Sequence, residues 1–122
     1  MKRIFYFLAL ILVVSTFHSC GVEEEFDETL LIGKWKQISG PEPVLNYRYD
    51  SNGSGVTWND EDGVNESQGR KFTWRLVKSE LTQIHIMGVG QTNPTFILTV
   101  IELTDKTLKY KDEFDRWTFN RL

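Results

Sequence analysis

Cysteine and histidine are almost absent from this sequence, and their scarcity excludes several kinds of chemistry. The 122 residues include one cysteine, Cys20, and two histidines, His18 and His85. A single cysteine cannot form an intramolecular disulfide, and a zinc site needs several His or Cys ligands. A Ser-His-Asp arrangement would depend on His85, which strand alternation places on an outward face. The sequence therefore predicts no catalytic residues, no metal site, no cofactor and no enzymatic activity.

Long apolar runs and clusters of basic residues are also scarce. The longest apolar run, "IFYFLALILVV" from Ile4 to Val14, has 11 residues, whereas a transmembrane helix needs about 20. The formal net charge is −3, and no group of Lys or Arg residues forms the basic footprint that nucleic acid requires. We expect neither a membrane-spanning helix nor a nucleic-acid partner.

The start of the chain has the order of a secretory signal peptide. Lys2 and Arg3 precede the apolar run, and a short polar stretch leads to Ser19 and Cys20. A cysteine directly after a small residue at such a site resembles the lipobox of bacterial lipoproteins, which implies cleavage before Cys20 and lipidation of its sulfur. An ordinary signal peptide with an isolated thiol near the cleavage point is the alternative. Loss of residues 1–19 would remove Lys2 and Arg3 and change the formal net charge from −3 to −5.

An acidic segment, "GVEEEFDE", directly follows Cys20. It resembles the export signal that sends lipoproteins of the Bacteroidetes to the outer face of the outer membrane, which implies a lipid-anchored protein that faces the cell exterior. The alternative is a solvated, flexible tether whose charges keep the chain off an anionic membrane surface. We therefore expect a signal peptide at residues 1–19, a lipidated acidic tether at residues 20–29 and one domain at residues 30–122.

Apolar and polar side chains alternate in short segments from Leu30 onward, and no helical period is present. Turn residues such as the Asn-Gly of "DSNG" separate these segments. The pattern predicts eight antiparallel strands in meander order, which close into an up-and-down barrel without free edges. A β-sandwich is the alternative. The segments are "LLIGKWKQIS", "LNYRYD", "GVTWN", "RKFTWRLVK", "ELTQIHIM", "TFILTVIEL", "KTLKYKD" and "DRWTFNRL".

The first predicted strand carries a Gly-x-Trp pattern in Gly33 and Trp35. Together with the order of the later segments, this pattern resembles the small lipocalin-like lipoproteins of the Bacteroidetes over residues 30–122. The resemblance implies that Trp35 closes one end of the barrel and that an arginine late in the chain, Arg116 or Arg121, covers it. It also implies a role in binding.

The apolar phase of each predicted strand defines the expected interior. Most of its side chains are aromatic, which favours a mostly filled lumen, since a barrel of about eight strands has room for its own side chains or for one small ligand. The alternative is a small pocket near the open end, where Tyr47, Tyr49, Trp58 and Trp74 would contact a small apolar or amphipathic ligand. The expected inward residues are Trp35, Tyr47, Tyr49, Trp58, Phe72, Trp74, Ile84, Ile86, Phe96, Leu98, Val100, Leu108, Tyr110, Trp117 and Phe119.

The segment "TFILTVIEL" is apolar on both faces, so Ile97, Ile101 and Leu103 are expected to point outward as an apolar stripe. Such a stripe is either a scatter of ordinary surface residues or a contact face for a second copy or another envelope protein. The alternative function is therefore a surface interaction or assembly module whose filled barrel contacts a protein through this stripe and its loops.

The loop "NDEDGVNESQG" contains four carboxylates, Asp60, Glu61, Asp62 and Glu66. Carboxylate oxygens suit calcium, but the spacing departs from the EF-hand pattern because Gly69 stands where a bidentate Glu is required. A solvated hairpin tip is the favoured interpretation.

Lipidation of Cys20 is testable in the full chain. We expect the protein to incorporate radiolabelled palmitate and to fractionate with membranes in a bacterial host that has the lipoprotein pathway, and the Cys20→Ala variant to lose both properties. Ser15→Ala, in the same segment, is the control and should behave as the unchanged chain. Equal labelling of the Cys20→Ala variant would contradict the lipoprotein assignment.

Overall fold

The computed structural model describes residues 24–122, so the predicted signal peptide and Cys20 lie outside the described residues. This part of the chain forms eight strands and three short 3-10 helices. Among residues 24–122, no helix has the length and apolar character needed to span a membrane. The strands are β1 (Gly33–Ser39), β2 (Asn46–Tyr49), β3 (Ser54–Trp58), β4 (Arg70–Val77), β5 (Glu80–His85), β6 (Thr95–Leu103), β7 (Thr107–Lys111) and β8 (Arg116–Arg121).

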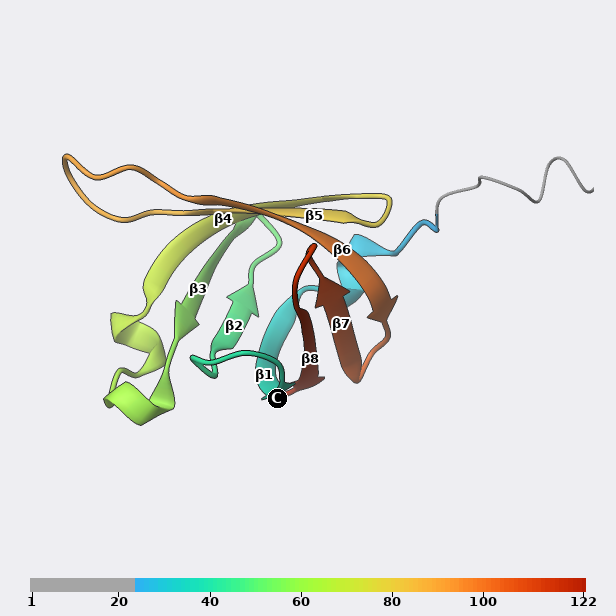
Figure 1. The fold of residues 1–122 in the computed structure, drawn as a ribbon, viewed down its shortest axis with the longest axis horizontal. Coiled ribbons are helices and arrows are strands. Elements are labelled where there is room, and N and C mark those ends of the chain that lie inside the picture. Colours follow the sequence, from blue (N-terminus) through green and yellow to red (C-terminus); the bar gives the residue numbers. More distant parts are fainter. Residues whose placement is uncertain (1–23) are drawn as a thin grey trace, which may run out of the picture.

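The strands form one closed barrel in which each strand pairs with the next along the chain and β1 pairs with β8. All pairs are antiparallel (Figure 1). The predicted up-and-down barrel is thus confirmed and the β-sandwich is excluded. Closure leaves neither β1 nor β8 with an unpaired edge.

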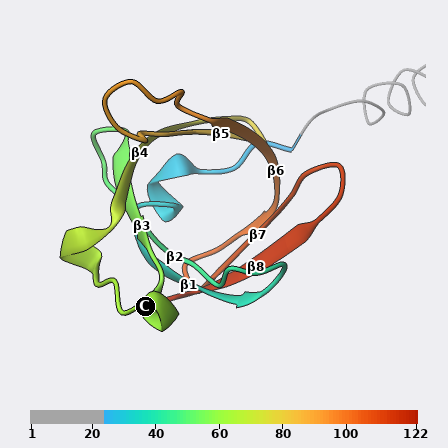
Figure 2. The same cartoon turned by 60° about the vertical axis from the view of Figure 1, so that its left-hand side comes forward.

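One end of the barrel is closed by the segment that precedes β1. The 3-10 helix η1 (Glu28–Leu30) starts at Asp27, whose side chain accepts a hydrogen bond from the backbone N–H of Thr29. Phe26 and Leu30 pack against the core, and η1 lies across the ring of strands in Figure 2. The end of the segment that we expected to be a tether, residues 20–29, therefore packs against the barrel.

Trp35 and Arg121 form the central contact at this closed end. Trp35 is fully buried, and its indole Nε1 donates to the carbonyl oxygen of Leu31 at 2.9 Å. The guanidinium carbon of Arg121 lies 4.3 Å from the centroid of the Trp35 ring, in cation–π geometry. Arg121 also donates to the carbonyl oxygens of Leu30, Ile32 and Asp105. Of the two candidate arginines, Arg121 is thus the one that covers Trp35.

Gly33 has two reasons to be glycine. Its φ angle is +130°, in the region that L side chains rarely adopt. A Cβ atom at this position would also collide with the guanidinium of Arg121. The Gly-x-Trp pattern therefore provides both the aromatic ring and the space that the covering arginine needs.

The predicted phase of β5 is wrong. Ile84 is exposed, whereas Leu81, Gln83 and His85 are buried. Ile86 follows the last residue of β5 and is half exposed, but it lines the open end of the barrel. A two-residue turn after Val77 sets the register by pairing Val77 with Glu80, and this register places Leu81 opposite the inward Leu76. Because side chains alternate along a strand, the same register turns His85 inward and Ile84 outward.

Leu103 is also placed differently from the prediction. Ile97 and Ile101 are exposed, at 62% and 39%, but Leu103 is only 7% exposed and belongs to the core. The pairing of β6 with β7 shifts between Val100 and Glu102, which marks a β-bulge. The extra residue reverses the alternation after Ile101 and turns Leu103 inward.

The acidic loop between β3 and β4 is tied to the outside of the barrel. It contains the 3-10 helices η2 (Asp60–Asp62) and η3 (Glu66–Gln68). Glu66 forms ion pairs with Lys34 at 2.9 Å and with Arg48 at 3.1 Å, and Asp60 accepts a hydrogen bond from Asn46 at 2.8 Å. The hydrogen bond from Lys34 is the main reason that the pKa of Glu66 is lowered. Two of the four carboxylates therefore hold the loop in place.

Replacement of the covering arginine tests the role of the closed end. We expect Arg121→Met to lower the free energy of unfolding by about 2 to 3 kcal/mol, because three carbonyl groups lose a charged donor and the ring of Trp35 loses its cover. Arg116→Met, five residues earlier in the same strand and exposed, should change it by less than about 0.5 kcal/mol. Urea unfolding followed by circular dichroism measures both. Equal losses in the two variants would contradict this role.

Candidate ligand-binding cavity

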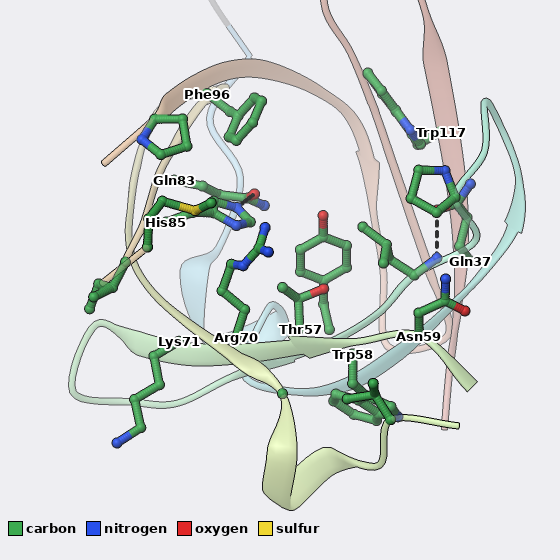
Figure 3. A pocket seen from close by; sticks show the side chains of 18 of the residues that line it. Gln37, Thr57, Trp58, Asn59, Arg70, Lys71, Gln83, His85, Phe96 and Trp117 are labelled. Carbon is green, nitrogen blue, oxygen red and sulfur yellow. Dashed lines mark hydrogen bonds between the residues drawn. The ribbon is translucent and has the colours of Figure 1, made fainter. Parts of the chain in front are cut away.

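The opposite end of the barrel contains a cavity of about 870 Å³. Its wall comes from the ends of the strands that adjoin the β1–β2, β3–β4 and β5–β6 connections, with Tyr110 of β7 and Trp117 of β8 completing it (Figure 3). This volume falls in the range of about 300–1,000 Å³ that is typical of small-molecule sites. The lumen is therefore filled at the closed end and hollow at the other, rather than mostly filled as expected.

Aromatic packing separates the cavity from the closed end. The ring of Tyr47 packs edge-on against Phe72 and Phe119, with centroids 5.7 and 5.6 Å apart. Tyr110 packs against Phe119 at 5.0 Å and against Trp117 at 5.4 Å. These rings are mutually oriented in ways that aromatic pairs favour. Tyr47 and Tyr110 thus form the floor of the cavity, and Phe72 and Phe119 pack beneath them.

The upper wall of the cavity is mainly apolar. Phe96 points inward from β6, and its ring packs edge-on against His85 with centroids 5.0 Å apart. Phe96 nevertheless remains 46% exposed, which shows that other side chains do not fill the space beside its ring. The other apolar and proline residues of the wall are Pro41, Pro43, Leu45, Trp58, Val64, Ile86, Met87, Pro94, Leu98 and Trp117.

A chain of hydrogen bonds crosses the floor. The side-chain N–H of Gln83 donates to the hydroxyl of Tyr49 at 2.7 Å, and its carbonyl oxygen lies 3.0 Å from Nε2 of His85. Because that oxygen can only accept, Nε2 of His85 carries the proton in this arrangement. The hydroxyl groups of Tyr47 and Tyr110 also hydrogen-bond to each other. In the described part of the chain, every buried polar side-chain atom has a partner.

Burial determines the charge state of these groups. It lowers the pKa of His85 to about 4, with a smaller contribution from the positive charge of Arg70. Burial raises the pKa of Tyr47, Tyr49 and Tyr110. At pH 7 the imidazole and the three phenols are therefore all neutral.

The structure brings together two of the four residues that we expected to contact a ligand. Tyr47 forms part of the floor. Trp58 has the outward phase of β3, whereas its neighbour Thr57 has the inward phase, and Trp58 borders the cavity at its edge. Tyr49 is fully buried beneath the floor. Trp74 lies at the closed end, where its Nε1 donates to the carbonyl oxygen of Ser54 at 2.9 Å. Contact of Tyr47 and Trp58 with a ligand stays a prediction.

Three polar residues of the cavity, Arg70, Gln83 and His85, were missed as candidates. Arg70 precedes the inward Phe72 by two residues, so the alternation of β4 already contained a signal for it. Gln83 and His85 gave no such signal, because β5 carries apolar side chains on both faces. His85 contacts Gln83, Phe72 and Phe96 rather than facing solvent.

Among the residues that the structure describes, no group of three or more His, Cys, Asp or Glu side chains is arranged so that it could hold a metal ion.

Comparison with known proteins supports the fold. No protein-family model matches the sequence, and no curated protein does. A solved lipocalin-like protein from Bacteroides uniformis superimposes with a TM-score of 0.57 and 14% identity, over 76% of this chain and 99% of the other. An uncharacterized protein from Bacteroides eggerthii gives a TM-score of 0.54 and 17% identity, over 75% and 98%.

The described residues thus have a lipocalin-like fold, as the Gly-x-Trp pattern and the strand order indicated. At these identities the similarity establishes the fold, and a lipocalin-like barrel with an internal cavity is compatible with binding of a small ligand.

The neutral state of His85 predicts its titration. In the chain from Gly21 onward His85 is the sole histidine, so its imidazole signals in an NMR pH titration are unambiguous, and we expect a pKa of about 4. The unfolded chain binds this proton near the ordinary pKa of about 6.5, so the stability of the fold is complete above that pH and decreases as the pH falls toward 4. His85→Gln should reduce this decrease. A measured pKa near the ordinary value would contradict the buried position.

Proposed function

We propose that this protein is a cell-envelope lipoprotein whose barrel binds a small apolar or amphipathic ligand without catalysis. The observation that carries the proposal is the half-filled lumen. Phe96 points into the barrel and is still 46% exposed, beside a cavity of about 870 Å³. A barrel that served only as a rigid body would gain stability by filling this space with side chains.

The composition of the cavity supports an amphipathic ligand. Apolar side chains and prolines form much of its wall, and they are combined with polar side chains of the strands, among them Thr57, Arg70 and His85. This combination is common in small-molecule sites, where apolar contacts provide affinity and a few polar groups fix the orientation. Because the imidazole of His85 is bonded to Gln83 and packed between Phe72 and Phe96, binding rather than proton transfer is the role we assign to the site.

The position of the cavity fits a lipid anchor at Cys20. Described residues from Glu24 onward enter the barrel at the closed end, through Phe26 and η1. The cavity is at the other end, beside the β1–β2, β3–β4 and β5–β6 connections. An anchor on Cys20 would therefore leave the cavity entrance free and facing away from the membrane. In an outer-membrane lipoprotein displayed at the surface, that entrance would face the cell exterior.

The alternative function is protein contact through the outer face. Ile97 and Ile101 are exposed on β6, which fits a contact for a second copy or an envelope protein. Leu103 does not belong to this surface, because it is in the core. The alternative also expected a filled barrel, so the cavity favours the ligand-binding function.

Substitutions at two adjacent residues of β6 distinguish the ligand-binding function from the alternative. Phe96 faces the cavity and Ile97 faces outward, and both are more than one third exposed. Tryptophan emission of the chain from Gly21 onward, which keeps every described strand and core residue, can be titrated with glycans, fatty acids, haem and bile acids. We expect one class to give a saturable change, since Trp58 and Trp117 border the cavity. Phe96→Ser should weaken that binding about tenfold, through loss of apolar contact.

Ile97→Ser is the matched control and should leave the affinity unchanged. Sedimentation velocity of the Ile97→Asp and Ile101→Asp variants tests the outer face separately. Loss of self-association in these variants, together with tryptophan emission that no compound changes, would contradict the ligand-binding function and support the alternative.

A further inference from the structure

Arg70 is a cationic side chain that points into the cavity. It is the first residue of β4 and pairs with Thr57 of β3, which in turn pairs with Tyr47 of β2. These three residues form one row on the inner face of the barrel, just above the aromatic floor. Figure 3 shows the guanidinium of Arg70 directed toward the cavity interior, near His85, while the amine of the next residue, Lys71, points away from it.

The carboxylates of the described residues do not neutralise Arg70. The described ion pairs join Lys34 and Arg48 to Glu66 and Asp50, on the outside of the barrel, and none of them includes Arg70. Glu42, the carboxylate among the lining residues, belongs to the β1–β2 connection and is exposed. The inner wall therefore carries a positive charge that is hydrated and has no anionic partner among the described ion pairs.

The other polar groups near Arg70 are already satisfied. Gln83 bonds to Tyr49 and His85, Thr57 donates to the carbonyl oxygen of Asn46 at 2.9 Å, and the hydroxyl of Tyr47 bonds to that of Tyr110. His85 adds no second charge at pH 7, because its pKa is about 4. On the inner face of the strands, a ligand in the cavity thus meets the guanidinium of Arg70 as a charged group that takes part in none of the described ion pairs. Glu42 and Lys71 also line the cavity, but Glu42 belongs to the β1–β2 connection and the amine of Lys71 points away from the interior.

Solvation decides which ligand suits this site. A molecule that fills the cavity displaces the water around Arg70, and loss of hydration without a compensating charge is costly. A neutral ligand would leave the cation unbalanced. A carboxylate would restore the balance, because its two oxygens match the paired N–H donors of a guanidinium.

We propose that the cavity binds an amphipathic molecule with a single anionic head group of the carboxylate type, that Arg70 binds this head group, and that the apolar body extends toward the entrance along Leu45, Phe96 and Trp117. This proposal rests on the ligand-binding function given above. It adds the charge of the ligand, its orientation and the residue that selects it.

A pair of probes that differ only in charge tests the proposal. Pyrenebutyric acid and pyrenebutanol share one apolar body, as do cis-parinaric acid and its alcohol. Both bodies accept energy from tryptophan, so quenching of the tryptophan emission measures binding to the chain from Gly21 onward. We expect each acid to bind about tenfold more tightly than its alcohol at low salt. This comparison uses the unchanged protein and needs no variant.

Two variants of β4 test whether Arg70 causes the preference for the acids. Arg70→Gln should reduce the affinity for the acids to that for the alcohols and leave the affinity for the alcohols unchanged, which also shows that the cavity is intact. Arg75→Gln is the matched control, since Arg75 is an exposed arginine of β4 on the outward phase. It should retain the full preference for the acids.

Three results would overturn the proposal, and they have different meanings. Equal affinities for acid and alcohol would show that the cavity binds ligands without selecting a charge, so the proposed function would stand and the inference would fail. A preference for the acids that survives Arg70→Gln would exclude Arg70 as the binding residue. Failure of all four probes to saturate would contradict the ligand-binding function itself.

Discussion

The covered Trp35 is the contact on which the rest of this barrel depends. Closure of eight strands requires β1 to pair with β8, and the ring of Trp35 and the guanidinium of Arg121 join these two strands at the closed end. Arg121 also binds the carbonyl groups of Leu30 and Ile32, so the segment before β1 is held across the same end. A single arginine thus connects the first strand, the last strand and the segment that covers the barrel.

Sealing one end determines where the lumen can remain open. The aromatic rings of Tyr47, Phe72 and Phe119 fill the middle of the barrel from wall to wall. At the other end the strands are joined by the longer β1–β2, β3–β4 and β5–β6 connections, and a cavity remains between the side chains. The same rings therefore provide the core that stabilises the fold and the floor of the candidate site.

Much of the fold follows from the sequence, because alternation and turn residues are local signals. The eight strands and their meander order are confirmed, as is the Gly-x-Trp pattern at the closed end. The phase of β5 could not be predicted, since Ile84 and Ile86 are as apolar as the residues on its inner face, and only pairing with β4 sets the register. The inward turn of Leu103 depends on a bulge in β6 that no local residue marks.

The candidate site is less predictable than the fold. Tyr47 was identified because large inward rings stand out, but Trp74 was assigned to the wrong end of the barrel, since a sequence does not show which turns meet. The alternation of β4 gives Arg70 the same phase as the inward Phe72, but its position beside Thr57 depends on a pairing across the long β3–β4 loop. Its importance becomes visible only when the surrounding charges and cavity are known.

The measurement that tests the central claim most directly is an amide NMR map of the chain from Gly21 onward, titrated with pyrenebutyric acid. If the barrel holds its ligand in the cavity, the shifts will saturate together and centre on Thr57, Arg70, His85 and Phe96, while Trp35 and Arg121 at the closed end stay unchanged. Shifts that centre on Ile97 and Ile101 of the outer face, or that fail to saturate, would contradict the account.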